Sequence, residues 1–231
     1  KLTDAGKAIN AVLASGANPS MIEIMDETAI ESVEEYLHMG LPLDVEAILL
    51  IQTDGDVADA ERGIEIAAEI CRQNGASDVR VAVTPEESAE MWKARGSISG
   101  SLGRIRPNKL GEDITIPHSA VPEMIAKIKE ISAKWDLPIV IFGHAGDGNL
   151  HPNILFDKRD EEESERVEQA VGDLFRAAVE VGGSLSGEHG VGVLKRPYLE
   201  MALGPLAVEM QKRIKQAWDP NNILNPGKIF E

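Results

Sequence analysis

Apolar residues recur along this chain with two spacings, which separate the expected helices from the expected strands. A spacing of three to four residues is typical of helices that bury one face. An aspartate or threonine often precedes such a stretch as a capping residue, and glycine often follows it. The pattern predicts helices over 3–14, 26–37, 57–73, 84–95, 122–134, 160–181 and 205–218. The helix from residue 84 is expected to end in the glycine-containing segment 96–103.

Shorter apolar runs predict strands, and two of them are expected to pair directly. Residues 138–142 and 150–156 flank a glycine-rich turn and should form a hairpin. Further strands are expected over 21–25, 46–52, 79–83 and 114–116. Strands separated by helices, with one direct strand-to-strand turn, indicate an α+β fold. We expect a ferredoxin-like antiparallel or mixed sheet with helices packed on one face.

Acidic residues follow the strand expected over 46–52. Asp54 and Asp56 could hold a cation, but aspartates between a strand and a helix serve as N-caps more often. We interpret this loop as a cap.

The turn of the expected hairpin carries the first candidate chemistry. Residues 143–153 read Gly-His-Ala-Gly-Asp-Gly-Asn-Leu-His-Pro-Asn, which brings His144 and His151 to one end of the sheet. A later Ser-Gly-Glu-His-Gly motif supplies Glu188 and His189. Two histidines and one glutamate form a catalytic zinc site that leaves a position open. If the backbone is extended at the second motif, His189 points away from Glu188, towards a reacting proton.

A basic cluster stands out because the 231-residue chain is acidic, with a net charge of −16. This charge argues against nucleic-acid binding. The cluster consists of Arg95, Arg104, Arg106 and Lys109. Arginine grips a carboxylate or phosphate with two hydrogen bonds, so Arg95, with Ser99 one helical turn later, is the preferred pair for an anionic substrate. The alternative is a solvated loop.

Other features bound the class of protein. The single cysteine, Cys71, excludes an intrachain disulfide, agrees with a reducing compartment and is expected to be a buried apolar filler. No apolar run reaches the ~18 residues of a membrane span, and no phosphate-binding glycine motif is present. We expect a cytoplasmic protein. Because the chain starts at Lys1 without a methionine, we also expect it to be part of a longer polypeptide.

Three motifs in order resemble the C-terminal half of FAD-linked oxidases of the vanillyl-alcohol oxidase type. They are the two-histidine turn, the Ser-Gly-Glu-His-Gly segment and the closing Asp-Pro-Asn-Asn-Ile-Leu-Asn-Pro-Gly-Lys of 219–228. The nearest branch contains the glycolate oxidase flavin subunit, D-lactate dehydrogenase and D-2-hydroxyglutarate dehydrogenase. The resemblance implies that 1–231 is the C-terminal substrate-binding (cap) domain. FAD would be bound mainly by an N-terminal domain absent from this chain.

The resemblance also implies a reaction, the oxidation of a D-2-hydroxy acid to the 2-oxo acid with hydride passing to FAD, and a role for each site residue. The ligands of a divalent metal, Zn²⁺ being the expected one, would be His144, His151 and Glu188. The base beside the flavin would be His189. The substrate contacts would be Arg95, Ser99, Lys109 and Asn153. The residues that return the chain towards the FAD domain would be Asn225 and Lys228.

The chain alone is expected to be inactive. Two further partners are possible from the sequence: a second copy of the chain, and an electron acceptor that could hold the protein at a membrane surface. Two other functions also stay open from the residues alone. One is a free-standing metal-dependent hydrolase that uses the His/His/Glu set and a water. The other is a non-catalytic anion-binding or assembly module in which the histidines are structural.

Overall fold

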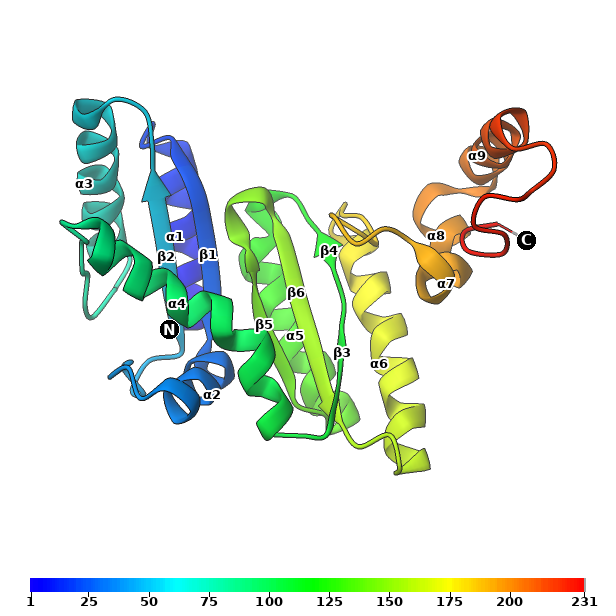
Figure 1. Ribbon diagram of the computed structural model, residues 1–231, viewed down its shortest axis with the longest axis horizontal. Helices are drawn as coiled ribbons and strands as arrows, with labels where there is room; N and C mark the ends of the chain where they lie inside the picture. The colour runs from blue at the N-terminus through cyan, green and yellow to red at the C-terminus, as the bar shows by residue number, and fades with distance from the viewer. Residues whose placement is uncertain (231) are drawn as a thin grey trace.

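The computed structural model describes residues 1–230 and has an antiparallel sheet at its centre (Figure 1). The strands are β1 (Pro19–Asp26), β2 (Ala47–Thr53), β3 (Asn108–Gly111), β4 (Ile114–Thr115), β5 (Ile139–His144) and β6 (Asn149–Phe156). Their order is β2-β1-β5-β6-β3, and β4 pairs with β6 beyond the end of β3. The expected α+β class with an antiparallel sheet is confirmed.

Helices cover the sheet in two unequal layers. The helices are α1 (Leu2–Ala14), α2 (Glu27–Leu37), α3 (Val57–Gln73), α4 (Pro85–Ser101), α5 (Val121–Trp135), α6 (Glu161–Glu180), α7 (Gly192–Lys195), α8 (Leu199–Leu203) and α9 (Pro205–Trp218). The larger core lies between one face of the sheet and the layer of α1, α5 and α6, with α3 against α1 and β2. In addition, α2 and α4 pack on the opposite face around a smaller core, so the expectation that the helices pack on one face is wrong.

Strand alternation decides which side chains reach each layer. On β5, Ile139 and Ile141 belong to the larger core, whereas Val140 and Phe142 belong to the smaller core under α2 and α4. Successive side chains of a strand point to opposite faces. His144, two residues after Phe142, therefore continues on the face that α4 covers.

The expected caps are present. The side chain of Asp26 accepts a hydrogen bond from the Ala29 N–H at the start of α2, and Asp56 does the same for Asp59 in α3. These bonds satisfy helix N–H groups that lack an intrahelical partner. The cap interpretation of the acidic loop before α3 is thus confirmed.

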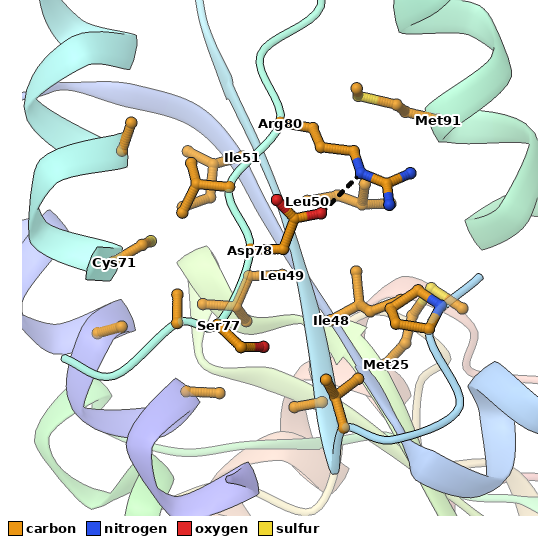
Figure 2. A pocket seen from close by; sticks show the side chains of 18 of the residues that line it. Met25, Ile48, Leu49, Leu50, Ile51, Cys71, Ser77, Asp78, Arg80 and Met91 are labelled. Carbon is orange, nitrogen blue, oxygen red and sulfur yellow. Dashed lines mark hydrogen bonds and ion pairs between the residues drawn. The ribbon is translucent and has the colours of Figure 1, made fainter. Parts of the chain in front are cut away.

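The strand expected over 79–83 is wrong, because this segment pairs with no other strand in the described chain. Arg80 pairs locally with Asp78, and Val83 is 82% exposed. The segment instead borders a largely apolar cavity of about 810 Å³ along the free edge of β2 (Figure 2). The alternating valines resemble a strand, but an extended segment becomes one only when a neighbour accepts its hydrogen bonds. Cys71 lines the same cavity and is half-buried.

The end expected for α4 is also wrong, because the helix continues through Gly96 and Gly100 to Ser101. Ala94 and Ile98 are buried in the smaller core, and the hydroxyl of Ser32 on α2 donates to that of Ser101. A glycine costs a helix about 1 kcal/mol relative to alanine, and burial of this face offsets that cost. The extension gives Ser99 its helical position.

The strand β3 and the short helices α7 and α8 were not expected from the sequence. They are only four to five residues long, too short to show a period. Within residues 1–230, the structure has no helix with the length and apolar character that crossing a bilayer requires.

Candidate metal and anion site

Two histidines meet at the end of the β5–β6 hairpin. Register pairs Phe142 with His151 and His144 with Asn149, so the alternation puts both imidazoles on the α4 face. The turn requires glycine at Gly148, where φ is 70° and an added Cβ would lie 2.1 Å from the Ile116 carbonyl oxygen. The two imidazole rings lie 5.2 Å apart between centroids.

A loop brings Glu188 to this pair, and one carboxylate holds the loop. Asp113, fully buried, accepts hydrogen bonds from the backbone N–H groups of Gly187, Glu188 and His189. The Ser186 hydroxyl also donates to Asp113. Burial alone would raise the pKa of Asp113, but these hydrogen bonds and the nearby Lys195 ammonium hold that pKa far below its usual range.

This loop corrects the expectation that Glu188 and His189 point to opposite sides. The backbone is bent around the Asp113 carboxylate rather than extended. As a result, the His189 ring stacks on His151 with centroids 5.3 Å apart, and its Nε2 lies 3.9 Å from Glu188 Oε1. Both side chains reach the same centre.

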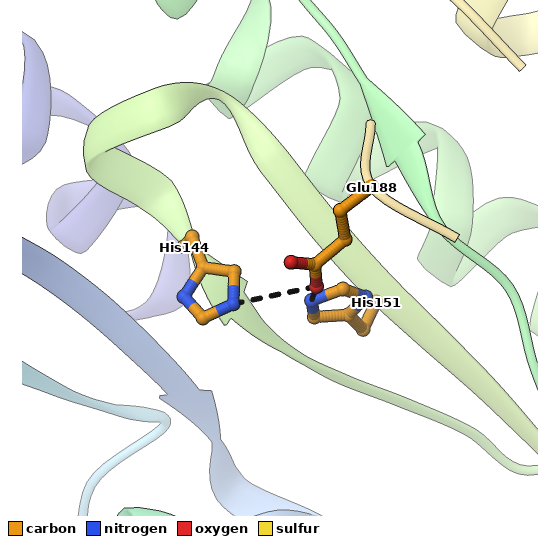
Figure 3. A group of neighbouring side chains, drawn as sticks. All are labelled: His144, His151 and Glu188. Atoms are coloured by element: carbon orange, nitrogen blue, oxygen red, sulfur yellow. Dashed lines mark ion pairs between the residues drawn. The ribbon is translucent and has the colours of Figure 1, made fainter. Parts of the chain in front are cut away.

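The three expected ligands converge (Figure 3). Glu188 Oε1 lies 3.3 Å from His151 Nε2 and 3.6 Å from His144 Nε2, and the ligand atoms all lie within 4.8 Å of one another. Zinc bonds of about 2.0 to 2.1 Å in a tetrahedral site separate neighbouring ligand atoms by roughly 3.3 Å. The donor set and its spacing therefore fit a divalent metal such as Zn²⁺.

The surroundings of His151 favour the neutral form that a metal requires. Burial lowers the pKa of His151, and the neighbouring His144 lowers it further. Glu23, a buried residue on β1, contacts Nδ1 of His144 with Oε1, so Nε2 faces the centre. In the described chain, Nδ1 of His151 has no hydrogen-bond partner.

The expected substrate residues share this face. Lys109 pairs with Leu155 across β3 and β6, and Asn153 pairs with Val140 across β6 and β5, so both point to the side of α4. Lys109 Nζ donates to the Ser99 carbonyl oxygen at 2.9 Å and to the Ser99 hydroxyl. Burial lowers the pKa of Lys109.

Arg95 is linked to His144 through Glu23, which contacts both side chains. Its Nε donates to Glu23 Oε2, and its guanidinium lies 5.0 Å from the centroid of the Phe142 ring. The basic cluster is thus divided. Arg104 stacks over Tyr36 and Arg106 pairs with Glu163, away from the histidines.

Asn225 and Lys228 lie outside this group. They belong to the C-terminal segment beside α7, α8 and α9, at the end of the molecule remote from β2 (Figure 1). The Lys228 N–H donates to the Asn225 carbonyl oxygen. Their role towards FAD stays a prediction.

Sequence reasoning missed Glu23 and Asp113. Glu23 carried one usable signal, because a charged residue in the apolar run Met-Ile-Glu-Ile-Met of a buried strand needs a partner. Asp113 carried none, because its partners are 73 to 76 residues further on.

Comparisons with known proteins agree with this fold. Residues 1–229 match the family described as FAD linked oxidases, C-terminal domain. Glycolate oxidase subunit GlcD of Bacillus subtilis is 42% identical over 226 residues, covering 98% of this chain and 48% of the relative. D-lactate dehydrogenase of Anaerostipes hadrus is 35% identical over 221 residues, covering 91% and 46%.

A solved structure, p-cresol methylhydroxylase with substrate bound, matches this chain with a TM-score of 0.71 at 16% identity, covering all of this chain and 50% of that one. This likeness supports the fold. The chain belongs to the family of FAD linked oxidases, C-terminal domain. It spans about half the length of the curated relatives it matches.

Proposed function

We propose that this chain is the substrate domain of an FAD-dependent enzyme that oxidises a D-2-hydroxy acid to the 2-oxo acid. Glycolate, D-lactate and D-2-hydroxyglutarate define the substrate class. Family membership and the names of the relatives, glycolate oxidase and D-lactate dehydrogenase, support the flavin chemistry. The main structural support is that His144, His151 and Glu188 converge on the same face of the sheet as Arg95.

The proposed metal ligands are His144, His151 and Glu188. A divalent metal held there would act as a Lewis acid that makes the substrate hydroxyl more acidic. Asp113 contributes by fixing the loop of Glu188 through three backbone hydrogen bonds. The chain thus holds the carboxylate of Glu188 in place before a metal binds, which lowers the entropic cost of assembling the site.

His189 is the proposed base. Its side chain is 52% exposed and stacks on His151, so it can reach a substrate at the centre while its outer edge stays open to solvent. It would take the hydroxyl proton as the carbonyl forms. The α-hydrogen and its electron pair leave as hydride, and FAD, when bound by the remainder of the full-length protein, supplies the acceptor. The chain alone is expected not to turn over.

Arg95 and Lys109 are proposed to bind the substrate carboxylates. In a chain of net charge −16, they place positive charge on the face of the sheet that carries the histidines, which favours an anion there. Ser99 and Asn153 add hydrogen-bonding groups on the same face. The planar guanidinium of Arg95 suits a carboxylate because both groups can form two parallel hydrogen bonds.

The partner of the C-terminal region is proposed to be the FAD-binding domain of the same full-length protein, with Asn225 and Lys228 at this boundary. Large apolar side chains are exposed on α9 and the segment after it, namely Leu206, Met210, Ile214, Trp218, Ile223 and Leu224. The four on α9 recur every four residues and so lie along one side of the helix, and exposed apolar patches of this kind mark interaction sites. In the full-length protein, Trp218→Ser should release FAD at a lower temperature, measured by flavin fluorescence, whereas the exposed Val83→Ser on another element should not.

A turnover assay on the full-length protein tests the reaction. Glycolate, D-lactate and D-2-hydroxyglutarate are added separately under anaerobic conditions, and bleaching of the flavin absorbance is recorded. At least one should reduce the flavin, and His189→Asn should slow that reduction by roughly 10²- to 10⁴-fold, the usual contribution of a general base. Absence of flavin reduction by all three acids would refute the proposal. Chelator-sensitive hydrolysis by the chain alone would favour a hydrolase instead.

A further inference from the structure

A single buried carboxylate links the candidate metal ligand to the candidate anion-binding arginine. Glu23 on β1 lies directly across from His144 on β5 and is 3% exposed. Its Oε1 contacts His144 Nδ1 and its Oε2 accepts from Arg95 Nε. We propose that Glu23 is the positioning residue that makes His144 a metal ligand, with Arg95 as the counter-charge that keeps Glu23 in place. This inference rests on the metal site of the proposed function.

The two ring nitrogens of His144 have different neighbours. A carboxylate only accepts hydrogen bonds, so the bond to Glu23 requires the hydrogen on Nδ1. The lone pair of the neutral ring then stays on Nε2, the atom that lies 3.6 Å from Glu188. A metal binds the lone pair. The hydrogen bond to Glu23 therefore selects the tautomer that can coordinate at the centre.

The second histidine provides an internal contrast. His151 Nε2 lies 3.3 Å from Glu188, as His144 Nε2 lies near the same carboxylate, but the buried Nδ1 of His151 has no hydrogen-bond partner among residues 1–230. No carboxylate selects its tautomer. Removing Glu23 should therefore act on metal binding through His144 and leave the tautomer of His151 unchanged.

Arg95 stabilises the charge of Glu23. A carboxylate that is 4% exposed in its side chain needs an opposite charge, and the arginine is the only cation that pairs with it in the described chain. The bond uses Nε and leaves both terminal Nη atoms of Arg95 without a hydrogen bond in residues 1–230. Arg95 can therefore hold Glu23 and still present its fork to a substrate carboxylate.

The test compares zinc affinity in the full chain with its variants, using competition against a chromophoric chelator. Glu23→Ala should weaken zinc binding by about 10- to 100-fold, the usual effect of losing the partner of a ligand histidine. Glu23→Gln should recover part of the loss, because its amide oxygen can still accept from Nδ1. Glu163→Ala is the matched control, since Glu163 is another buried glutamate paired with an arginine. It should not change zinc affinity.

A second measurement does not depend on any variant or on metal. In the metal-free wild type, two-bond ¹H–¹⁵N correlation spectra of the histidines should show His144 with hydrogen on Nδ1.

A further variant tests the counter-charge. Arg95→Met should weaken zinc binding, as Glu23→Ala does. The inference is overturned by wild-type His144 with hydrogen on Nε2, by unchanged zinc affinity in Glu23→Ala, or by an equal loss in Glu163→Ala. If the wild type binds no zinc, the proposed metal site fails, and the His144 tautomer still decides the role of Glu23.

Discussion

Replacing Asp113 by asparagine should release the loop that carries Glu188 and His189. The carboxylate of Asp113 accepts three backbone N–H groups and the Ser186 hydroxyl, and the Lys195 ammonium lies 3.5 Å away. An asparagine has the same shape but only one accepting oxygen. Its amide N–H₂ would face N–H donors, so several of these groups would lose their partner.

The size of the effect follows from these contacts. Removing one partner of a buried charge pair costs about 3 to 5 kcal/mol, and hydrogen bonds to charged groups contribute about 1.5 to 3 kcal/mol each, without adding fully. We expect Asp113→Asn to lower the free energy of unfolding by about 3 to 5 kcal/mol. For a domain of this length, each kcal/mol shifts Tm by about 2 to 4 °C. The expected loss is therefore roughly 6 to 20 °C.

Thermal unfolding followed by circular dichroism measures the stability, and zinc titration measures the effect on the site. Asp173→Asn is the matched control, because Asp173 accepts from Lys134, Trp135 and Arg176 on the helical layer away from the histidines. It should lower Tm without changing zinc affinity. If Asp113→Asn binds zinc and unfolds like the wild type, this carboxylate does not hold the loop.

Three further predictions concern charge, metal and substrate. Burial raises the pKa of Glu112 to about 7, so the folded state binds its proton more tightly than the unfolded state does, and stability falls as the pH rises from about 4.5 to about 7. Between pH 4 and pH 8, the free energy of unfolding of Glu112→Gln should therefore rise by up to roughly 3 kcal/mol relative to that of the wild type, as measured by urea unfolding. An equal pH dependence of the two proteins would contradict this. Zinc at 100 times its Kd should stabilise the wild type by about 2.7 kcal/mol, and a Tm rise that persisted in His144→Ala would place the ion elsewhere. In the full-length protein, Arg95→Lys should lower kcat/KM for the hydroxy acid roughly 10- to 100-fold, because lysine lacks the planar guanidinium that forms two parallel hydrogen bonds. Unchanged kinetics would exclude bidentate binding of the substrate carboxylate by Arg95.

Local signals in the sequence were enough to predict most elements and to single out the candidate ligands. Capping aspartates, such as Asp26 and Asp56, mark helix starts because their partners lie within three residues. The hairpin followed from two apolar runs around a glycine-rich turn. The identities of His144, His151 and Glu188 indicated metal chemistry, and their convergence agrees with that prediction.

Long-range contacts decided what the sequence could not show. The segment 79–83 alternates like a strand but found no partner, and α4 passed its glycines because Ala94 and Ile98 are buried against other elements. Glu23 is 121 residues from His144, and Asp113 is 73 to 76 residues from the groups it holds. No local pattern marks such pairs, because they form only when the sheet and its loops are assembled. The chemistry of the site was thus determined by residue types, whereas its orientation and support were determined by the tertiary structure.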